Sequence, residues 1–127
     1  MRTAKSERLP VWVQSARNAI QRWWRRIRRR RRLRGYAFVA AMDEDLALTR
    51  GGVAVVGSME RQKWATFACP CRCGEVIALN LMWSHSPRWA IELHADGTVS
   101  LAPSVVATRC GSHFWIRRSR VEWVDGV

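Results

Sequence analysis

The chain has 127 residues, 48% of them hydrophobic, and a net charge of +12 at pH 7. This length allows one domain with a modest core and excludes two ordinary ones, and a domain of this size gains from a bound metal. The charge is uneven, because residues 1–34 hold thirteen of the twenty-two Lys and Arg residues and a single acid, Glu7. The balanced remainder argues against a domain that binds nucleic acid through a general positive excess.

Residues 1–35 are predicted to form a basic arm with an amphipathic helix. Its apolar residues recur at helical spacing among arginines: Trp12, Ala16, Ile20, Trp23, Trp24 and Ile27. Pro10 suits the first turn of this helix and Gly35 the position just past its end. The apolar stripe covers only about ten residues and is interrupted by charge, so it is too short to span a bilayer.

Three functions suit such an arm: binding phosphate backbones, lying on an anionic membrane with tryptophans at the interface, and docking to an acidic protein. The alternatives are an arm that is solvated and disordered on its own, or a start of translation further along the chain, at Met42 or Met59. Sequence-specific reading of DNA is not expected, because the five arginines 28–32 carry charge but no code for base edges.

Residues 36–127 are predicted to form a mainly β domain, built on antiparallel hairpins. The predicted strands are residues 36–42, 53–56, 64–68, 75–81, 89–93, 98–101 and 120–124. In the predicted strand 89–93, Ile91 and Leu93 alternate with polar or small residues, which is typical of a strand with one solvent-exposed face. Asp96-Gly97 predicts a hairpin turn, and residues 43–48 predict a short helix.

Two cysteine-bearing segments predict a zinc site that staples this domain. Cys69, Cys71 and Cys73 lie in CPCRCG, and Cys110 and His113 lie in CGSH. Zn²⁺ prefers four such ligands in a tetrahedron, so one of the five candidates is in excess, and the spacing does not decide which.

Other interpretations of the cysteines are buried or redox-active thiols and two disulfides. The chain shows no secretory signal, which argues against disulfides and favours a cytoplasmic protein. His85 and His94 have no cysteine near them in the sequence and are expected to be surface or loop residues.

Three segments together resemble a bacterial domain family called BubE: WATFACPCRCGEVIALNL, RWAIELHADGTVSLAPSV and CGSHFWIRRSRVEW. In that family a CPCGCG turn, a DGT-x-x-L-x-PS segment and a C-x-SHF-x-I segment occur in this order. The resemblance covers roughly residues 50–124 and departs at Arg72, where the family usually has Gly. Its members are encoded beside a ubiquitin-like protein and its activating and conjugating enzymes. The resemblance implies a role in processing or removing that modifier, or in assisting its transfer, with the modifier or its conjugation enzymes as partners.

A peptidase needs a nucleophile with a base within hydrogen-bond reach, and Ser104 and His113 are the first candidates. Ser112 adjoins His113, but neighbouring side chains on a strand point to opposite faces. The pair requires that four cysteines fill the metal site and leave His113 free. If the two residues are not catalytic, Ser104 is a turn serine beside Pro103, and His113 is either a metal ligand or a core histidine whose ring hydrogen bonds are made within the protein.

A zinc-water hydrolase is a further alternative, with three cysteines and His113 as ligands and Glu75 or Glu92 as base. Asp96 is better explained by its turn than as the acid of a triad. We therefore expect a zinc-binding protein of a ubiquitin-like modifier pathway that acts as a serine-type peptidase. The alternative is a non-enzymatic zinc module that binds nucleic acid or an anionic surface through its arm.

Overall fold

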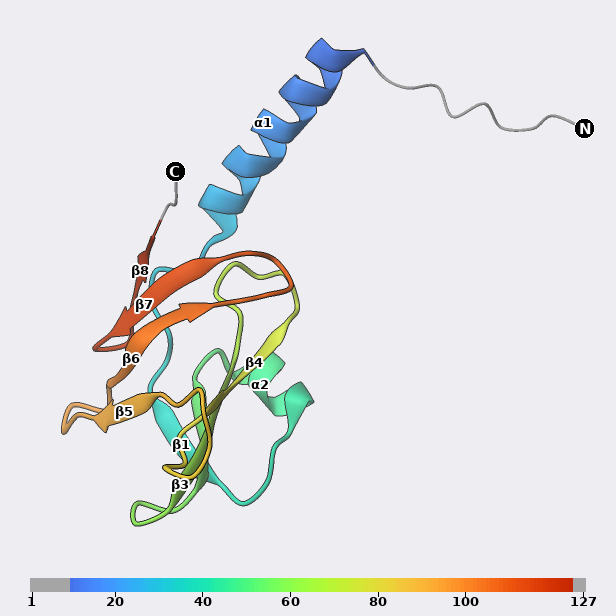
Figure 1. Ribbon diagram of the computed structural model, residues 1–127. Helices are drawn as coiled ribbons and strands as arrows, with labels where there is room; N and C mark the ends of the chain where they lie inside the picture. The colour runs from blue at the N-terminus through green and yellow to red at the C-terminus, as the bar shows by residue number, and fades with distance from the viewer. Residues whose placement is uncertain (1–9, 125–127) are drawn as a thin grey trace, which may run out of the picture.

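Two four-stranded sheets pack against each other in a domain that follows a long helix (Figure 1). The computed structural model describes residues 10–124, and for residues 21, 22, 25–28 and 48–50 it describes the backbone alone. The first nine residues of the predicted arm and the last three of the chain lie outside this range. The described part of the chain is a mainly β domain preceded by a basic helix, which agrees with the prediction from the sequence.

The first sheet has the order β1-β2-β3-β4, with β1 at Tyr36–Val39, β2 at Val53–Gly57, β3 at Gln62–Ala68 and β4 at Val76–Asn80. β1 and β2 pair in parallel, which the expectation of antiparallel hairpins did not include. Helix α2 (Glu44–Arg50) connects them, since parallel neighbours need a crossover. The Asp43 side chain caps this helix by accepting a hydrogen bond from the Leu46 N–H at 3.1 Å.

The second sheet has the order β5-β6-β7-β8, with β5 at Ala90–Leu93, β6 at Val99–Val106, β7 at His113–Arg117 and β8 at Arg120–Trp123. All its pairs are antiparallel. The predicted turn joins β5 to β6, and its Asp96 carboxylate accepts hydrogen bonds from the Thr98 hydroxyl and N–H at 2.6 and 2.9 Å. These bonds lower the pKa of Asp96, which confirms its role in the turn.

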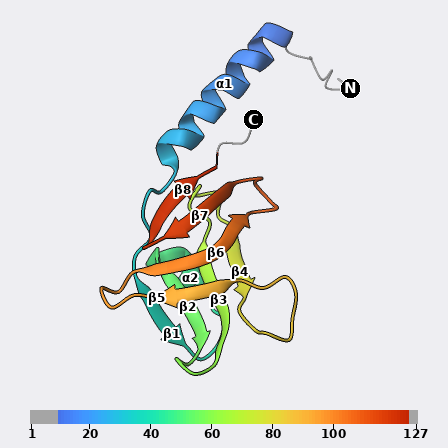
Figure 2. The ribbon, with the colours of Figure 1, turned by 60° about the vertical axis from the view of Figure 1, so that its left-hand side comes forward.

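The core lies between the two sheets (Figure 2). Phe67 of β3 and Phe114 of β7 are both fully buried, and their rings meet edge to face with centroids 6.3 Å apart. Fully burying one such side chain contributes about 1.5–3 kcal/mol, so this pair is a major link between the sheets. Ala90 and Glu92 are exposed while Ile91 and Leu93 pack against the core, as the alternation predicts.

Helix α1 (Val11–Arg28) begins directly after Pro10 and projects away from both sheets (Figures 1 and 2). It ends at Arg28 rather than at Gly35, so the predicted end of the helix is wrong. Gly35 serves another purpose, because a Cβ there would lie 2.7 Å from the Gly97 carbonyl oxygen. Among the helices that the structure describes, none is long and apolar enough to cross a membrane.

The segment between α1 and β1 belongs to the packed domain. The Leu33 N–H donates to the Ser119 carbonyl at 2.8 Å, and the Val121 N–H donates to the Arg31 carbonyl at 2.9 Å. Leu33 is 5% exposed and lies in the core cluster. The division of the sequence at residue 35 assigned this leucine to the arm, because one leucine among arginines has no periodicity to place it.

Candidate active site and cysteine cluster

The hairpin between β3 and β4 presents three cysteines. Its turn is closed by two backbone hydrogen bonds, from the Cys69 N–H to the Glu75 carbonyl at 2.8 Å and from the Arg72 N–H to the Cys69 carbonyl at 2.9 Å. Arg72 has a φ of 65° and Gly74 one of 88°. This is the left-handed region that favours glycine. Arg72, the residue that departs from the family pattern, therefore adopts a backbone conformation that glycine adopts without steric cost.

Cys110 arrives from the loop between β6 and β7. Its Sγ atom lies 3.7 Å from that of Cys69 and 3.6 Å from that of Cys71, which in turn lie 3.4 Å apart. With Cys73 included, the four sulfur atoms all lie within 4.8 Å of one another. Four thiolates arranged tetrahedrally at the Zn–S bond length of about 2.3 Å would lie about 3.8 Å apart. The cluster therefore fits a metal ion that prefers sulfur ligands.

The sulfur atoms differ in how readily they ionise. Burial raises the pKa of Cys69, whose side chain is almost fully enclosed. Burial also acts to raise the pKa of Cys110, but hydrogen bonding with the hydroxyl and N–H of Ser112, and with the thiols of Cys71 and Cys69, outweighs it and lowers this pKa to about 7. One sulfur atom of the set is thus close to its thiolate form at neutral pH.

His113 lies outside this cluster and pairs with Ser104. The Oγ atom of Ser104 is 2.8 Å from Nε2 of His113, and both residues are half-buried. His113 is the first residue of β7, and Ser112 before it points the other way, with its Oγ atom 3.2 Å from Cys110 Sγ. The expected alternation of Ser112 and His113 is confirmed.

A bulge in β6 presents Ser104. Between the pairs Leu101–Ile116 and Val105–Phe114, residues 102–104 of β6 face Trp115 alone on β7. The bulge bends β6 and frees Ser104 from the regular ladder. The sequence predicts that this strand ends at Leu101, whereas β6 continues to Val106 because the bulge accommodates Pro103, which cannot donate to a ladder.

Residues 38–124 match the family model described as "bacterial ubiquitination-like system serine protease (BubE)". The chain belongs to this family. The match covers Ser104, His113 and all four cysteines, whereas α1 lies before it. No curated protein and no solved structure matches the chain.

No acid side chain contacts His113 in the described part of this BubE chain. Within residues 10–124, Ser104 is the hydrogen-bond partner of the His113 ring, and no carboxylate joins them. Glu75 has a buried carboxylate oxygen, Oε2, without a hydrogen-bond partner in that range, and Glu92 lies 4.0 Å from Nδ1 of His94. The described residues thus show a serine–histidine pair, a dyad, without an acid beside it.

The other two histidines also contact serines. His85 is exposed, with Nδ1 2.8 Å from the Ser84 hydroxyl, and Nε2 of His94 is 2.7 Å from the Ser100 hydroxyl. Both lie outside the cysteine cluster, as expected. Ser100, which no pattern in the sequence singles out, faces His94 across the β5–β6 hairpin, and its hydroxyl also accepts a hydrogen bond from the Arg118 N–H at 2.9 Å.

A shallow pocket of about 490 Å³ lies on the outer face of the second sheet, and its lining includes Ala102 and Trp115, two residues from Ser104 and His113 respectively. Because side chains alternate along a strand, Trp115 and Arg117 point to the same face as His113, and Phe114 and Ile116 are buried on the other. The lining residues are Ala90, Ile91, Glu92, His94, Ser100, Leu101, Ala102, Trp115, Ile116, Arg117 and Arg118. At the end of the pocket that lies toward Ser104 in the sequence of β6, the floor consists of two exposed alanines, Ala90 and Ala102, which pair across the strands β5 and β6.

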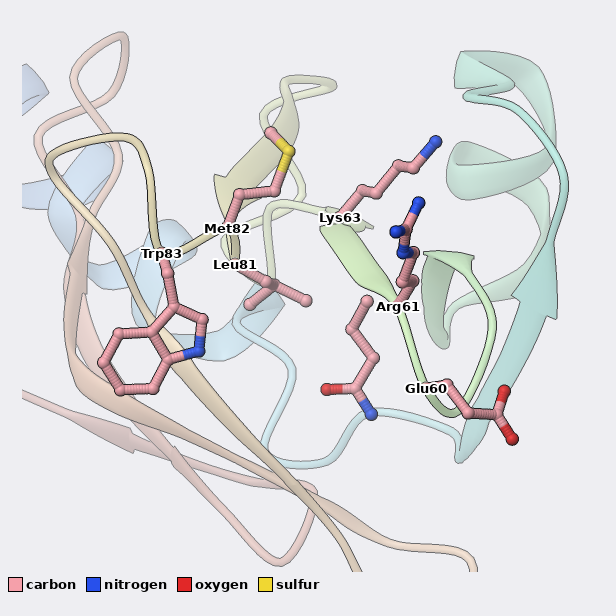
Figure 3. Close-up of a pocket in the computed structure, with 7 residues that line it drawn as sticks. Glu60, Arg61, Lys63, Leu81, Met82 and Trp83 are labelled. Atoms are coloured by element: carbon pink, nitrogen blue, oxygen red, sulfur yellow. The ribbon is translucent and has the colours of Figure 1, made fainter.

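A second hollow, of about 390 Å³, lies between the β2–β3 hairpin and the segment after β4 (Figure 3). Its lining residues are Glu60, Arg61, Gln62, Lys63, Leu81, Met82 and Trp83. Figure 3 shows Trp83 and Met82 on one side and the charged residues on the other. None of the seven is a serine, cysteine or histidine, so this hollow has no nucleophile of its own.

Proposed function

We propose that this protein is a serine peptidase of a bacterial ubiquitin-like modifier pathway, with Ser104 as nucleophile and His113 as general base. The observation that carries the proposal is the distance of 2.8 Å between Ser104 Oγ and His113 Nε2, in a chain whose family is described as a serine protease. A nucleophile and a base within hydrogen-bond reach are what acyl transfer requires.

The reaction follows from this contact. With a neutral imidazole protonated at Nδ1, the Ser104 hydroxyl donates to Nε2 of His113. As Oγ bonds to the carbonyl carbon of the substrate, its proton moves to Nε2, which then passes it to the leaving nitrogen as the C–N bond breaks. Water next attacks the acyl-serine and gives one proton to Nε2. Release of the carboxylic acid restores the serine hydroxyl.

The backbone holds His113 in place where a triad would use an acid. The Val124 N–H donates to the His113 carbonyl at 2.9 Å, and the indole N–H of Trp89 donates to the Ser104 carbonyl at 3.4 Å. Both catalytic residues are therefore tied through their main chains to neighbouring elements. This arrangement supports a positioned dyad without a carboxylate orienting the imidazole.

We propose that the four cysteines hold a structural Zn²⁺ and that His113 is free of it. Four sulfur atoms within 4.8 Å of one another leave a tetrahedral ion with no open position, which is typical of structural sites and speaks against a zinc-water hydrolase. Such an ion would pin the loop that carries Cys110 to the β3–β4 turn. That loop leads directly into His113, so the metal would fix where the base begins.

The proposed substrate is the modifier, either as a precursor or joined to a target in the reducing cytoplasm. The pocket on the outer face of the second sheet is open and shallow, and its floor of Ala90 and Ala102 would leave room for an extended chain that runs on toward Ser104, two residues after Ala102. A flexible tail fits such a surface better than the folded body of a substrate does. Trp115 and Arg117 lie further along the same face to contact residues away from the cleaved bond.

The test is cleavage of a ubiquitin-like modifier from a BubE-containing pathway, followed by mass spectrometry, together with labelling by a fluorophosphonate probe. Wild-type protein should be labelled at Ser104 and should cleave the modifier. Ser104→Ala should lose both properties. Ser112→Ala is the matched control because Ser112 adjoins His113 but faces away from it, and it should keep both. Cleavage by Ser104→Ala at the wild-type rate would refute the proposal.

A further inference from the structure

We propose that α1 is a membrane-surface anchor, which lies in the plane of an anionic lipid bilayer and holds the catalytic domain against it. The inference concerns a part of the chain that the BubE match does not include and is independent of any peptidase activity. It rests on the apolar side of α1, on its charge, and on the way in which the domain holds its base.

The apolar residues of α1 occupy one side of the helix and face solvent. At 3.6 residues per turn, Trp12, Ile20 and Trp23 fall on the same side, with Val13, Ala16 and Trp24 between or beside them. The exposed fractions are 74% for Trp12, 54% for Ile20, 57% for Trp23 and 51% for Trp24. Because α1 points away from both sheets, the domain leaves this side uncovered (Figures 1 and 2).

The charge of α1 is entirely positive. The sequence of the helix contains five arginines, at positions 17, 22, 25, 26 and 28, and no acid. A cationic residue close to an anionic membrane surface contributes about 1 kcal/mol to binding. The charge of α1 thus complements acidic lipid headgroups.

A membrane surface is the partner that uses both the exposed apolar stripe and the positive charge of α1. A nucleic acid would engage the arginines through its phosphates and would leave the stripe with its three tryptophans in water. Tryptophan prefers the boundary between headgroups and acyl chains, and a helix with one apolar and one cationic face lies in that boundary. The 18 residues of α1 include five arginines and make the helix too short in apolar sequence to cross a bilayer, so it would lie on the surface.

The domain holds the base of α1 firmly, which makes the helix an anchor instead of a loose tail. The Arg30 N–H donates to the Pro70 carbonyl at 2.7 Å, and the Trp123 indole N–H donates to the Arg30 carbonyl at 3.3 Å. The Arg29 guanidinium lies 4.4 Å from the centre of the Trp123 ring. Trp123 pairs with Phe114, the residue after His113, so binding through α1 would hold the dyad end of the domain near the membrane.

The experiment is sedimentation of full-length protein with vesicles of phosphatidylcholine, alone or with about one third phosphatidylglycerol. We expect most of the protein to pellet with the mixed vesicles and little with phosphatidylcholine alone. Trp23→Ala combined with Trp24→Ala should lower partitioning by about tenfold or more, because two apolar side chains no longer enter the bilayer. Trp83→Ala is the matched control, since Trp83 is 88% exposed but lies on the domain, and it should partition like the wild type.

Two results would overturn the proposal. One is equal sedimentation with both kinds of vesicle, and the other is undiminished sedimentation of the double tryptophan variant. A parallel titration with labelled duplex DNA distinguishes membrane binding from nucleic-acid binding by the arm. The double variant keeps its arginines and should therefore keep any salt-sensitive DNA binding. If DNA prevents the wild type from sedimenting and the tryptophans prove irrelevant, the arm is a nucleic-acid binder. Modifier cleavage by the double variant in solution should be unchanged, whichever result is found.

Discussion

Cys110 and His113 are three residues apart in the chain, yet they face two different clusters. Cys110 Sγ lies 3.7 Å from Cys69 Sγ, and His113 Nε2 lies 2.8 Å from Ser104 Oγ. The loop between β6 and β7 thus contributes Cys110 to the cysteine cluster and leads directly into His113, the first residue of β7. A metal ion held by the first would fix the start of the strand that carries the second.

The first prediction tests whether His113 acts with Ser104 and is not a ligand of the metal. His113→Gln should keep one metal ion per chain, because four cysteines remain, and should lower kcat by at least about a thousandfold because the general base is lost. Metal content by atomic emission and single-turnover cleavage of the modifier check the two halves. Loss of the metal in this variant would return His113 to the ligand set and remove it from catalysis.

The second prediction concerns the metal itself. Cys110→Ser should lose the ion, lower the melting temperature and reduce cleavage, because the loop before β7 is released from the β3–β4 turn. Thermal unfolding with and without a strong chelator measures the effect. Ser104→Ala is the control, since it should bind metal and unfold like the wild type. If chelation leaves the unfolding of the wild type unchanged, the cluster has no structural metal.

The sequence predicts the mainly β class, most strands and the turn at Asp96, because these follow from local alternation and turn chemistry. It does not predict β7, since Trp115 faces outward between buried Phe114 and Ile116 and makes the segment continuously apolar. The parallel pairing of β1 with β2 depends on contacts across α2 that no local pattern encodes.

At the candidate site, the sequence offers five metal ligands and one serine–histidine pair without relating them in space. To assign Cys110 to the cysteine cluster and His113 to the pair with Ser104, one must know in which direction each side chain points. That direction depends on the bulge at residues 102–104 and on the start of β7 at His113. Both are set by cross-strand register, which spacing along the chain does not reveal.

The third prediction tests the cysteine turn through its backbone. Arg72→Gly should raise the free energy of unfolding by about 1 kcal/mol, because glycine adopts a φ of 65° without the steric cost of a side chain. Gly74→Ala is the matched opposite: its φ is 88° and no atom lies within 4 Å of an added Cβ, so only backbone strain destabilises it. Chemical denaturation of both variants with metal bound provides the comparison. A loss of stability in Arg72→Gly would mean that the arginine side chain supports the turn.

The fourth prediction tests the proposed path of the substrate. Ala102 is exposed on β6, pairs with Ala90, lines the pocket and is the first residue of the bulge that carries Ser104. Ala102→Leu should raise KM for the modifier by about tenfold, because the larger side chain rises from the floor on which the tail lies. Ala78→Leu is the matched control, since Ala78 is an exposed strand alanine of the other sheet. Fluorophosphonate labelling of Ser104 should persist in both variants, since a small probe needs only the dyad. An unchanged KM in Ala102→Leu, with labelling intact, would mean that the tail approaches Ser104 from another side.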